Sequence, residues 1–375
     1  MTVPASALPL RGVRVLDLGW LLPAPFASAI LSDLGADVIK IERPCGGDYL
    51  RELSPALFTK INAGKRSVTL DLKQKEDLDK FLALAAKADV LLESFRPGVA
   101  KRLGIDSDSL RALRPELVYV SLSGFGQTGP LAQQPGHDIN YLALAGALSI
   151  PGHWGQPARR NGIPLADLAS SLYAVINVLA ALRNRDAGQG GASIDVAIAE
   201  SVLHWSNTRF GDFQPHVRDD PWAHVHPAND VFTTADGSEI ALGLIEVHFW
   251  NNFCAAADRP LMRELIHRPG VQGKRALQQA LVEAVGSRTL AEWQERFVKW
   301  DVPYSVVHEP AEVLAEPQFL ERHMLAVAED AAGAQVSVVA LPGRAFGHIF
   351  HEPGRVARAP TEGEHTEELL GIHGD

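Results

Sequence analysis

The sequence predicts an α/β fold, with a Rossmann-like large domain built on a parallel sheet and a smaller α+β domain. Three observations lead to this prediction. Strand and helix patterns alternate over the first 200 residues, which is typical of a parallel sheet with crossover helices. The periodicity then disappears in a stretch rich in Pro, His and Trp between Gly211 and Pro227. Finally, 375 residues exceed a typical single domain, so two lobes are expected.

The large domain is expected to begin with a β-loop-α-β unit. The run Val13 to Leu18 starts with β-branched residues and predicts a strand, the run Phe26 to Leu34 predicts a helix, and Asp37 to Glu42 predicts a second strand. The glycine-rich dinucleotide fingerprint is missing after the first of these strands. We therefore expect no nicotinamide or flavin cofactor. Further strands are expected at residues 68–72, 90–93, 117–122 and 192–196, with helices at 75–88, 168–182 and 197–207.

The expected domain boundaries follow from these patterns. Residues 1–210 would form the first part of the large domain, 211–227 the linker and 228–320 the small domain. Residues 321–375 would return to the large domain and end in a tail. The small domain is expected to hold a hairpin around the Asp236-Gly237 turn and the helices 249–257, 277–285 and 290–299.

The charge distribution limits the possible partners. The net charge is −10, which speaks against a nucleic acid. Residues 1–105 hold 15 Lys and Arg against 12 Asp and Glu, so this part carries +3 and the remainder −13. A basic N-terminal third suits a bound polyanion, although solvated helix faces would explain many of these charges equally well.

Other features point to a cytoplasmic enzyme. Only Cys45 and Cys254 are present, without metal-ligand spacing, which favours a reducing compartment without structural disulfides. The N-terminus lacks the layout of a signal peptide. Charges are expected to interrupt every apolar run before it could span a membrane, so no membrane partner is expected.

The strongest candidates for catalysis are His137 and Asp167. His137 follows a turn-rich segment and starts an element, which is where a scaffold presents chemistry to a cleft, and histidine exchanges protons near neutral pH. Asp167 falls at or near the N-cap of the helix at 168–182, where backbone N–H groups and the helix dipole could also hold an anion. Helix capping alone would explain an aspartate there, but His137 and Asp167 together indicate a catalytic site more strongly than either residue does.

Four basic residues lie in or near loops that follow predicted strands. They are Arg43, Lys65, Arg66 and Arg96. Because ligands of parallel sheets gather at the carboxyl ends of the strands, these side chains are candidates to bind phosphate. For Lys65 and Arg66, beside the flexible Gly64, a simple basic turn explains the residues equally well.

The motifs around His137 resemble a known family. The segment Gly124-Phe125-Gly126-Gln127-Thr128-Gly129-Pro130, followed by Gly136-His137-Asp138-Ile139-Asn140-Tyr141, is similar to the α-methylacyl-CoA racemases of the family III CoA-transferase superfamily. The resemblance covers nearly the whole chain and starts at Leu10. It implies an acyl-CoA substrate, with coenzyme A as part of that substrate, no permanently bound cofactor and no metal. It also places CoA contacts in the basic loops.

The resemblance adds a third catalytic candidate, Glu246. In the racemases the matching glutamate supports the catalytic histidine, commonly from the second subunit of an interlocked dimer. A carboxylate that accepts a hydrogen bond from one ring nitrogen of a histidine raises the basicity of the other ring nitrogen. We therefore expect an interlocked homodimer in which Glu246 reaches His137, although an ordinary carboxylate at a helix start is the simpler explanation of this residue.

Two activities are compatible with these residues. In a racemase, His137 and Asp167 would transfer protons on opposite faces of the α-carbon through an enolate. In a CoA-transferase, Asp167 alone would act as a nucleophile and form an aspartyl-CoA thioester. The sequence favours the racemase, because formyl-CoA transferases usually lack a histidine at the position of His137 and carry a glycine-rich lid that is missing near Glu246. A CoA-binding protein without catalysis is a third possibility.

Three departures favour the transferase. Racemases usually have Asn four residues before the catalytic aspartate, where this chain has Ile163. The segment from His226 to Phe232 and the tail from Gly363 to Leu370 both look more similar to transferases. The sequence does not identify the acyl group.

Overall fold

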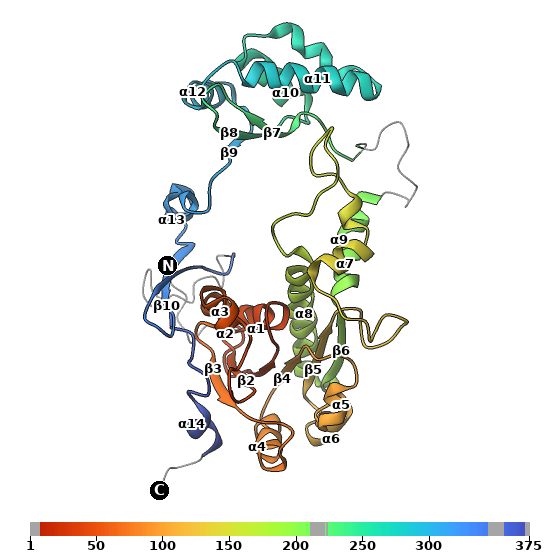
Figure 1. Cartoon of the computed structure of the whole chain (residues 1–375), viewed down its shortest axis with the longest axis vertical. Coiled ribbons are helices and arrows are strands. Elements are labelled where there is room, and N and C mark those ends of the chain that lie inside the picture. Colours follow the sequence, from red (N-terminus) through yellow and green to blue (C-terminus); the bar gives the residue numbers. More distant parts are fainter. Residues whose placement is uncertain (1–7, 211–221, 223, 344–355, 372–375) are drawn as a thin grey trace. The chain divides into compact units, whose positions relative to one another are not determined.

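The computed structural model describes residues 8–210, 222, 224–343 and 356–371. The described residues form two compact units (Figure 1). The first contains residues 1–145, 162–205 and 314–375, and the second contains residues 146–161 and 206–313. Three differences from the expected boundaries stand out. Residues 146–161 and 206–210, expected in the large domain, belong to the second unit, and residues 314–320, expected in the small domain, belong to the first. Most of the expected linker, at residues 211–221 and 223, lies outside the described residues.

The first unit is built on a six-stranded parallel sheet. Its order is β3-β2-β1-β4-β5-β6, which is the order of the Rossmann fold. The strands are β1 (Arg14–Leu18), β2 (Asp37–Glu42), β3 (Arg66–Thr69), β4 (Val90–Glu93), β5 (Val118–Ser123) and β6 (Ala192–Ala197). The core strands are almost wholly buried because helices cover both faces of a sheet of this kind. The expected α/β class with a parallel sheet is confirmed.

Helices connect these strands. They are α1 (Pro23–Asp33), α2 (Leu50–Leu53), α3 (Pro55–Asn62), α4 (Lys75–Ala85), α5 (Val99–Leu103), α6 (Ser107–Leu113), α7 (Asp138–Leu144), α8 (Leu165–Asn184) and α9 (Ile198–Phe210). The chain returns to this unit through α13 (Pro317–Glu321), the hairpin of β10 (Leu325–Glu329) and β11 (Gln335–Val339), and α14 (Thr366–Leu370).

The helix α8 corrects one expectation. With the π turn that follows, it spans Leu165–Gln189, and its length and mean hydropathy of 1.7 would allow it to cross a membrane. Within its first 18 residues the charge of Asp167 stands alone, so the expectation that charges interrupt every apolar run is wrong here. Half of the apolar window is nevertheless buried in the fold. Its Ala169, Ala174 and Val178 side chains are fully buried, as in a core helix of an α/β protein.

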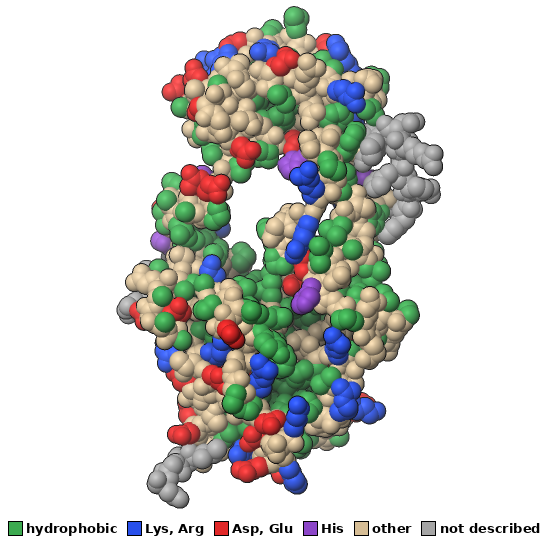
Figure 2. All heavy atoms as spheres, viewed as in Figure 1, with side chains coloured by type: hydrophobic (Ala, Val, Ile, Leu, Met, Phe, Trp, Pro, Cys, Tyr) green, Lys and Arg blue, Asp and Glu red, His purple; other side chains and the backbone are tan. Residues whose placement is uncertain are grey.

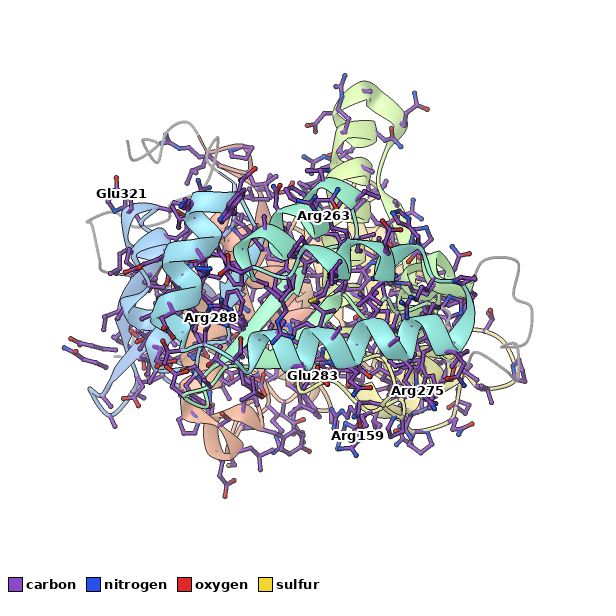
Figure 3. All side chains as sticks on the ribbon, turned by 90° about the horizontal axis from the view of Figure 1, so that it is seen from above. Arg159, Arg263, Arg275, Glu283, Arg288 and Glu321 are labelled. Atoms are coloured by element: carbon purple, nitrogen blue, oxygen red, sulfur yellow. The ribbon has the colours of Figure 1, made fainter. Side chains whose placement is uncertain are left out.

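The second unit has its own sheet and core. The antiparallel strands β7 (Asn229–Thr233), β8 (Glu239–Gly243) and β9 (Tyr304–Val306) pack with the helices α10 (Val247–Ala256), α11 (Gly270–Val285) and α12 (Leu290–Trp300). The helix α11 buries Leu277 and Leu281 and exposes Arg275 and Glu283 (Figure 3). This amphipathic pattern explains why the sequence predicts its second half correctly.

Candidate active site

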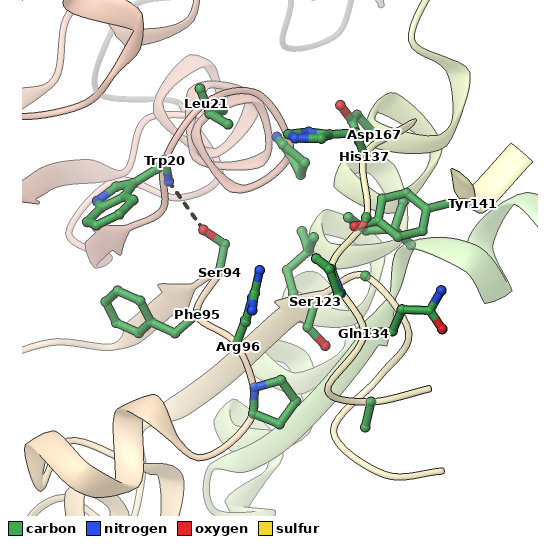
Figure 4. Close-up of a pocket in the computed structure, with 18 residues that line it drawn as sticks. Trp20, Leu21, Ser94, Phe95, Arg96, Ser123, Gln134, His137, Tyr141 and Asp167 are labelled. Atoms are coloured by element: carbon green, nitrogen blue, oxygen red, sulfur yellow. Dashed lines mark hydrogen bonds between the residues drawn. The ribbon is translucent and has the colours of Figure 1, made fainter. Parts of the chain in front are cut away.

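A cavity lies at the point where the order of the large sheet reverses. The chain goes outward from β1 to β2 and β3, then crosses back to β4 beside β1. Loops that leave β1 and β4 in opposite directions open a crevice between them, which is where α/β proteins bind ligands. The cavity has a volume of about 420 Å³ and is drawn in Figure 4. Its walls come from the loops after β1, β4 and β5 and from the starts of α7, α8 and α9, and include Trp20, Leu21, Ser94, Phe95, Arg96, Ser123, Gln134, His137, Tyr141, Asp167 and Ile198.

His137 lies on the wall of this cavity as the N-cap residue of α7. Its backbone is extended, with φ −130° and ψ 172°, and its N–H donates to Oδ1 of Asn140 at 3.0 Å. The turn-rich segment ends at His137 and α7 begins after it, and the imidazole at this junction is exposed. The position agrees with the expected start of an element.

Asp167 lies on the same cavity, in the first turn of α8. The N-cap of that helix is Pro164, so Asp167 stands three residues further on, near the expected position. The N–H of Leu165 donates to Ile163 O at 2.9 Å, and the N–H of Ala166 donates to Asp138 Oδ1 at 2.8 Å. These two helix-start donors are therefore occupied and do not form the anion site that we expected around Asp167.

The Asp138 carboxylate connects the two catalytic candidates. It is buried, and through Ala166 it ties the first residue of α7 to the first turn of α8. His137 precedes Asp138 and Asp167 follows Ala166, so a single hydrogen bond fixes the neighbours of both candidates. Asp138 was not predicted as a site residue, although it lies inside the motif Gly136-His137-Asp138-Ile139-Asn140-Tyr141.

Burial and two charged residues of the cavity affect the pKa of Tyr141. Burial raises its pKa to about 12, the negative charge of Asp167 adds to this rise, and the positive charge of Arg96 opposes it. A Cβ atom on Gly124 would lie 2.5 Å from the Tyr141 hydroxyl, so glycine is needed for the ring to fit. Tyr141, Asp167 and Arg96 therefore share one electrostatic environment.

Arg96 is the one lysine or arginine among the described residues that line the cavity. It follows β4, and Figure 4 shows its side chain pointing from that loop into the cavity. Trp20 and Phe95, also on the wall, pack edge-on at 6.2 Å between ring centroids. The sequence offers Trp20 as a residue that could line an acyl pocket, with core packing as the simpler role. Phe95 was not predicted, although its place after the end of β4 could have identified it.

The other basic candidates lie elsewhere in the first unit. Arg43 places its guanidinium 4.4 Å from the ring centroid of Tyr49, and its Nε donates to Gly47 O at 3.1 Å. Arg66 pairs with Asp37 of β2 and, at 3.2 Å, with Glu368 of α14. Arg43 is exposed and follows β2, at the carboxyl edge of the sheet. Arg66 is half-buried and is the first residue of β3, so it lies at the amino end of a strand and not in a loop that follows one.

Lys65 faces the interior. Its side chain has no exposed surface, and its ammonium donates to Asp17, Ser28, Asn62 and the carbonyl of Pro25 at 2.7–3.0 Å. Burial lowers its pKa to about 8, although Asp17 opposes that change. A phosphate contact would require the ammonium to leave four acceptors, so we no longer assign Lys65 to phosphate binding.

Glu246 belongs to the second unit. It is the exposed N-cap residue of α10, with φ −75° and ψ 137°. Its expected contact with His137 stays a prediction. Among the residues that the structure describes, no group of three or more His, Cys, Asp and Glu side chains could hold a metal ion.

The comparisons with known proteins identify the family. The model of CoA-transferase family III matches residues 10–366. The chain belongs to CoA-transferase family III. The predicted membership of the family III CoA-transferase superfamily is therefore confirmed. The prediction that the protein is an enzyme of this class is also confirmed.

Named relatives are similar over most of their length. The chain is 32% identical to the succinyl-CoA–L-malate CoA-transferase alpha subunit of Chloroflexus aurantiacus, over 99% of this chain and 90% of the relative. It is 34% identical to acetyl-CoA:oxalate CoA-transferase of Acetobacter aceti, over 86% and 87%. These names support the transferase alternative better than the racemase that the sequence favoured.

Solved structures of the family have the same fold. Rv3272 of Mycobacterium tuberculosis is 30% identical with a TM-score of 0.81, covering 97% of this family III chain and 99% of the solved one. A CAIB/BAIF family protein from Brucella suis is 27% identical with a TM-score of 0.80, covering 97% and 98%. The expected interlocked homodimer stays a prediction.

Proposed function

We propose that this enzyme transfers CoA from an acyl-CoA to a second carboxylic acid, with Asp167 as the nucleophile. The observation that carries the proposal is an aspartate on the wall of a cavity at the switch point of the sheet, in a chain whose relatives are named CoA-transferases. Covalent catalysis by a carboxylate divides one difficult acyl exchange into easier steps.

The proposed reaction needs no reactant besides the acyl-CoA and the acceptor acid. The Asp167 carboxylate attacks the thioester carbonyl, the C–S bond breaks, and a mixed anhydride and CoA thiolate form. The thiolate then attacks the Asp167 carbonyl of the anhydride, which releases the first acid as its carboxylate and leaves an aspartyl-CoA thioester. The acceptor carboxylate attacks this thioester, and the displaced thiolate takes the new acyl group from the second anhydride. Asp167 is regenerated.

For the substrates we propose dicarboxylic acids. Several relatives are named for malate, oxalate, mesaconate and glutarate, which are acids with two carboxyl groups. Arg96 offers the cavity a guanidinium, which suits planar, bidentate binding of a carboxylate. One carboxylate of the acceptor acid would attack the thioester at Asp167, and the other would form an ion pair with Arg96. This replaces the expected CoA contact of Arg96, while Arg43 and Arg66 stay candidates for the CoA phosphates.

Several expectations stay part of this proposal. We propose a cytoplasmic homodimer without a resident cofactor, in which Glu246 supports the site. Exposed apolar side chains on α8, at Leu172, Ile176 and Leu179, would suit a subunit contact. Hydrophobic side chains also reach the surface of the first unit on the face drawn in Figure 2. Racemisation is the second candidate, and the observation in its favour is that His137 and Asp167 line one cavity.

The test is direct detection of the covalent intermediate. Wild-type enzyme incubated with succinyl-CoA, without acceptor, should gain the mass of CoA less one water on the peptide that contains Asp167. Addition of malate should remove this mass and release malyl-CoA. An Asp167→Ala variant should stay unmodified. If wild type instead exchanges the α-proton of a branched acyl-CoA with deuterated water and never carries CoA, the transferase proposal is wrong.

A further inference from the structure

The loop between β1 and α1, residues 19–22, contains a strained residue at the cavity. Leu21 lines the cavity and has a left-handed backbone with φ +61°. Such a conformation is unfavourable for a leucine because of its Cβ atom, and it persists only where the surroundings impose it. In this protein the surroundings do impose it.

Side chains from several elements hold the backbone of this loop. The N–H of Gly19 donates to Asp17 Oδ1 at 2.9 Å, and the N–H of Leu21 donates to Asp48 Oδ1 at 3.2 Å. The N–H of Trp20 donates to Ser94 Oγ at 3.2 Å, and the carbonyl of Gly19 accepts from Lys40 Nζ at 2.9 Å. Three consecutive residues are thus bound by β1, β2, the loop after β2 and the loop after β4.

The charged members of this set are fully buried. Lys40 Nζ lies 2.9 Å from Asp48 Oδ2 and 4.0 Å from Asp17 Oδ2, and none of the three side chains has exposed surface. Burial would lower the pKa of Lys40, but Asp17 and Asp48 outweigh it and raise the pKa, so the ammonium stays charged. A buried ion pair contributes little net stability compared with apolar packing, which points to a role in conformation.

The far end of the loop reaches the turn that carries Asp167. Ser171 Oγ lies 2.7 Å from the carbonyl oxygen of Pro23, the first residue of α1, and 2.9 Å from the carbonyl oxygen of Asp167. The loop is therefore bound by Lys40 and Asp48, and the start of α1, which directly follows the loop, is bound to the first turns of α8.

We infer that Lys40 and Asp48 are positioning residues for the reaction at Asp167. They hold Leu21 in its left-handed conformation and so fix the cavity wall formed by Trp20 and Leu21 against the reacting aspartate. This inference rests on the proposed function. Catalysis depends steeply on such placement, since a shift of about 1 Å can cost about 10²-fold in rate.

The test compares Asp48→Ala with its rescue by Leu21→Gly. Asp48→Ala removes the acceptor of the Leu21 N–H and should lower kcat for CoA transfer by about 10²-fold, with a smaller change in KM. Glycine adopts positive φ without a Cβ penalty. The double variant Asp48→Ala/Leu21→Gly should therefore regain at least about tenfold in kcat over Asp48→Ala, whereas Leu21→Gly alone should not exceed wild type.

Ser28→Ala is the matched control. Ser28 is buried in the same cluster, where its hydroxyl donates to Asp17 Oδ2 at 2.6 Å, and its other hydrogen-bond partners are Pro25 and Lys65 rather than residues 19–22. It should lower the thermal unfolding temperature and leave kcat near that of wild type. An Asp48→Ala variant that loses no more kcat than Ser28→Ala, or that Leu21→Gly does not rescue, would overturn the inference.

Hydrogen exchange separates this inference from the proposed function. The peptide covering residues 19–22 should exchange faster in Asp48→Ala than in wild type and Ser28→Ala, whatever reaction the enzyme catalyses. Unchanged exchange contradicts the inference, while absence of CoA transfer in wild type contradicts the proposed function alone. If Asp48→Ala does not fold, the double variant Lys40→Met/Asp48→Ala removes both positioning residues together, while Asp17 keeps its ion pair with Lys65. Exchange and kcat equal to those of wild type in that variant would overturn the inference.

Discussion

The carboxylate of Asp138 accepts a hydrogen bond of 2.8 Å from the backbone N–H of Ala166, across 28 residues of sequence. Each partner is the immediate neighbour of a catalytic candidate, Asp138 of His137 and Ala166 of Asp167. Because Asp138 and Ala166 are both buried, this bond fixes the starts of α7 and α8 from which the two side chains reach the cavity. It also satisfies one of the N–H groups that a helix start leaves without an intrahelical partner.

We predict that Asp138→Ala lowers turnover more than Asp138→Asn. Alanine removes the acceptor and leaves the Ala166 N–H buried without it, which costs about 1–3 kcal/mol, whereas asparagine keeps an oxygen at the same place. Steady-state kinetics and thermal unfolding of both variants would check this. Equal kcat values in the two variants would show that the bond does not position the site.

The second prediction separates the two activities through His137. In the proposed transferase, Asp167→Ala abolishes turnover and His137→Ala costs little. In a racemase, His137→Ala removes one of two proton-transfer groups and lowers epimerisation by about 10²-fold or more. The measurement pairs deuterium uptake at the α-carbon with CoA transfer to an added acid, in wild type and both variants. Deuterium uptake by wild type that falls in His137→Ala would contradict the transferase.

The third prediction concerns two arginines with different surroundings. Arg96→Ala should raise KM for a dicarboxylic acceptor by about tenfold to a hundredfold, since a charge-assisted hydrogen bond contributes about 1.5–3 kcal/mol. The same change should matter much less for a monocarboxylic acceptor. Arg102→Ala, at an exposed arginine of α5 that does not line the cavity, is the control for loss of a cation, and it should leave the acceptor KM unchanged. An equal effect of Arg96→Ala on both acids would move Arg96 from the acid to the CoA.

The sequence was most informative for strands that are buried on both faces. The runs Asp37 to Glu42 and Val90 to Glu93 match β2 and β4 residue for residue, because strands of this kind are rich in apolar residues. The loops after such strands were also predictable as ligand sites, and Arg96 lies in one of them.

Other parts of the site depend on contacts between distant residues. The sequence shows Lys65 beside a glycine, but only the fold brings Asp17, Ser28 and Asn62 around its ammonium. Similarly, the sequence places Asp167 near a helix start but does not show that Asp138 occupies the N–H of Ala166. The segment 146–161 continues the chain after the first unit, and long-range packing assigns it to the second.

The fourth prediction concerns assembly. Ile176 exposes 57% of its surface on α8, between the exposed Leu172 and Leu179. In the proposed homodimer a partner subunit covers this face, so Ile176→Glu should weaken association, and light scattering should give a mass nearer 40.5 kDa than twice that value. Leu261→Glu, at a residue 91% exposed in the second unit, is the control and should leave the mass unchanged. A wild type that is active as a monomer would contradict the dimer.

The last prediction follows from Glu93, at the end of β4. Burial raises the pKa of this carboxyl from its ordinary value of 4.5 to about 7, and the charge of Asp195 adds to the rise, while Ser121 and the Phe95 N–H oppose it. The Phe95 N–H donates to Glu93 Oε2 at 2.7 Å, so the group supports the loop that carries Arg96. The folded state therefore holds the Glu93 proton more tightly than the unfolded chain does.

The sign of the effect on stability follows directly. Between pH 4.5 and about 7 the folded state binds more protons at Glu93, so its contribution is complete below pH 4.5 and is lost as the pH rises through about 7. Glu93→Gln keeps an acceptor for the Phe95 N–H and cannot ionise. We expect it to match wild type near pH 5 and to be more stable at pH 8, by at most about 3 kcal/mol. The measurement is denaturant unfolding of both proteins from pH 5 to 8. A stability difference that does not change with pH would show that Glu93 ionises normally in the folded protein.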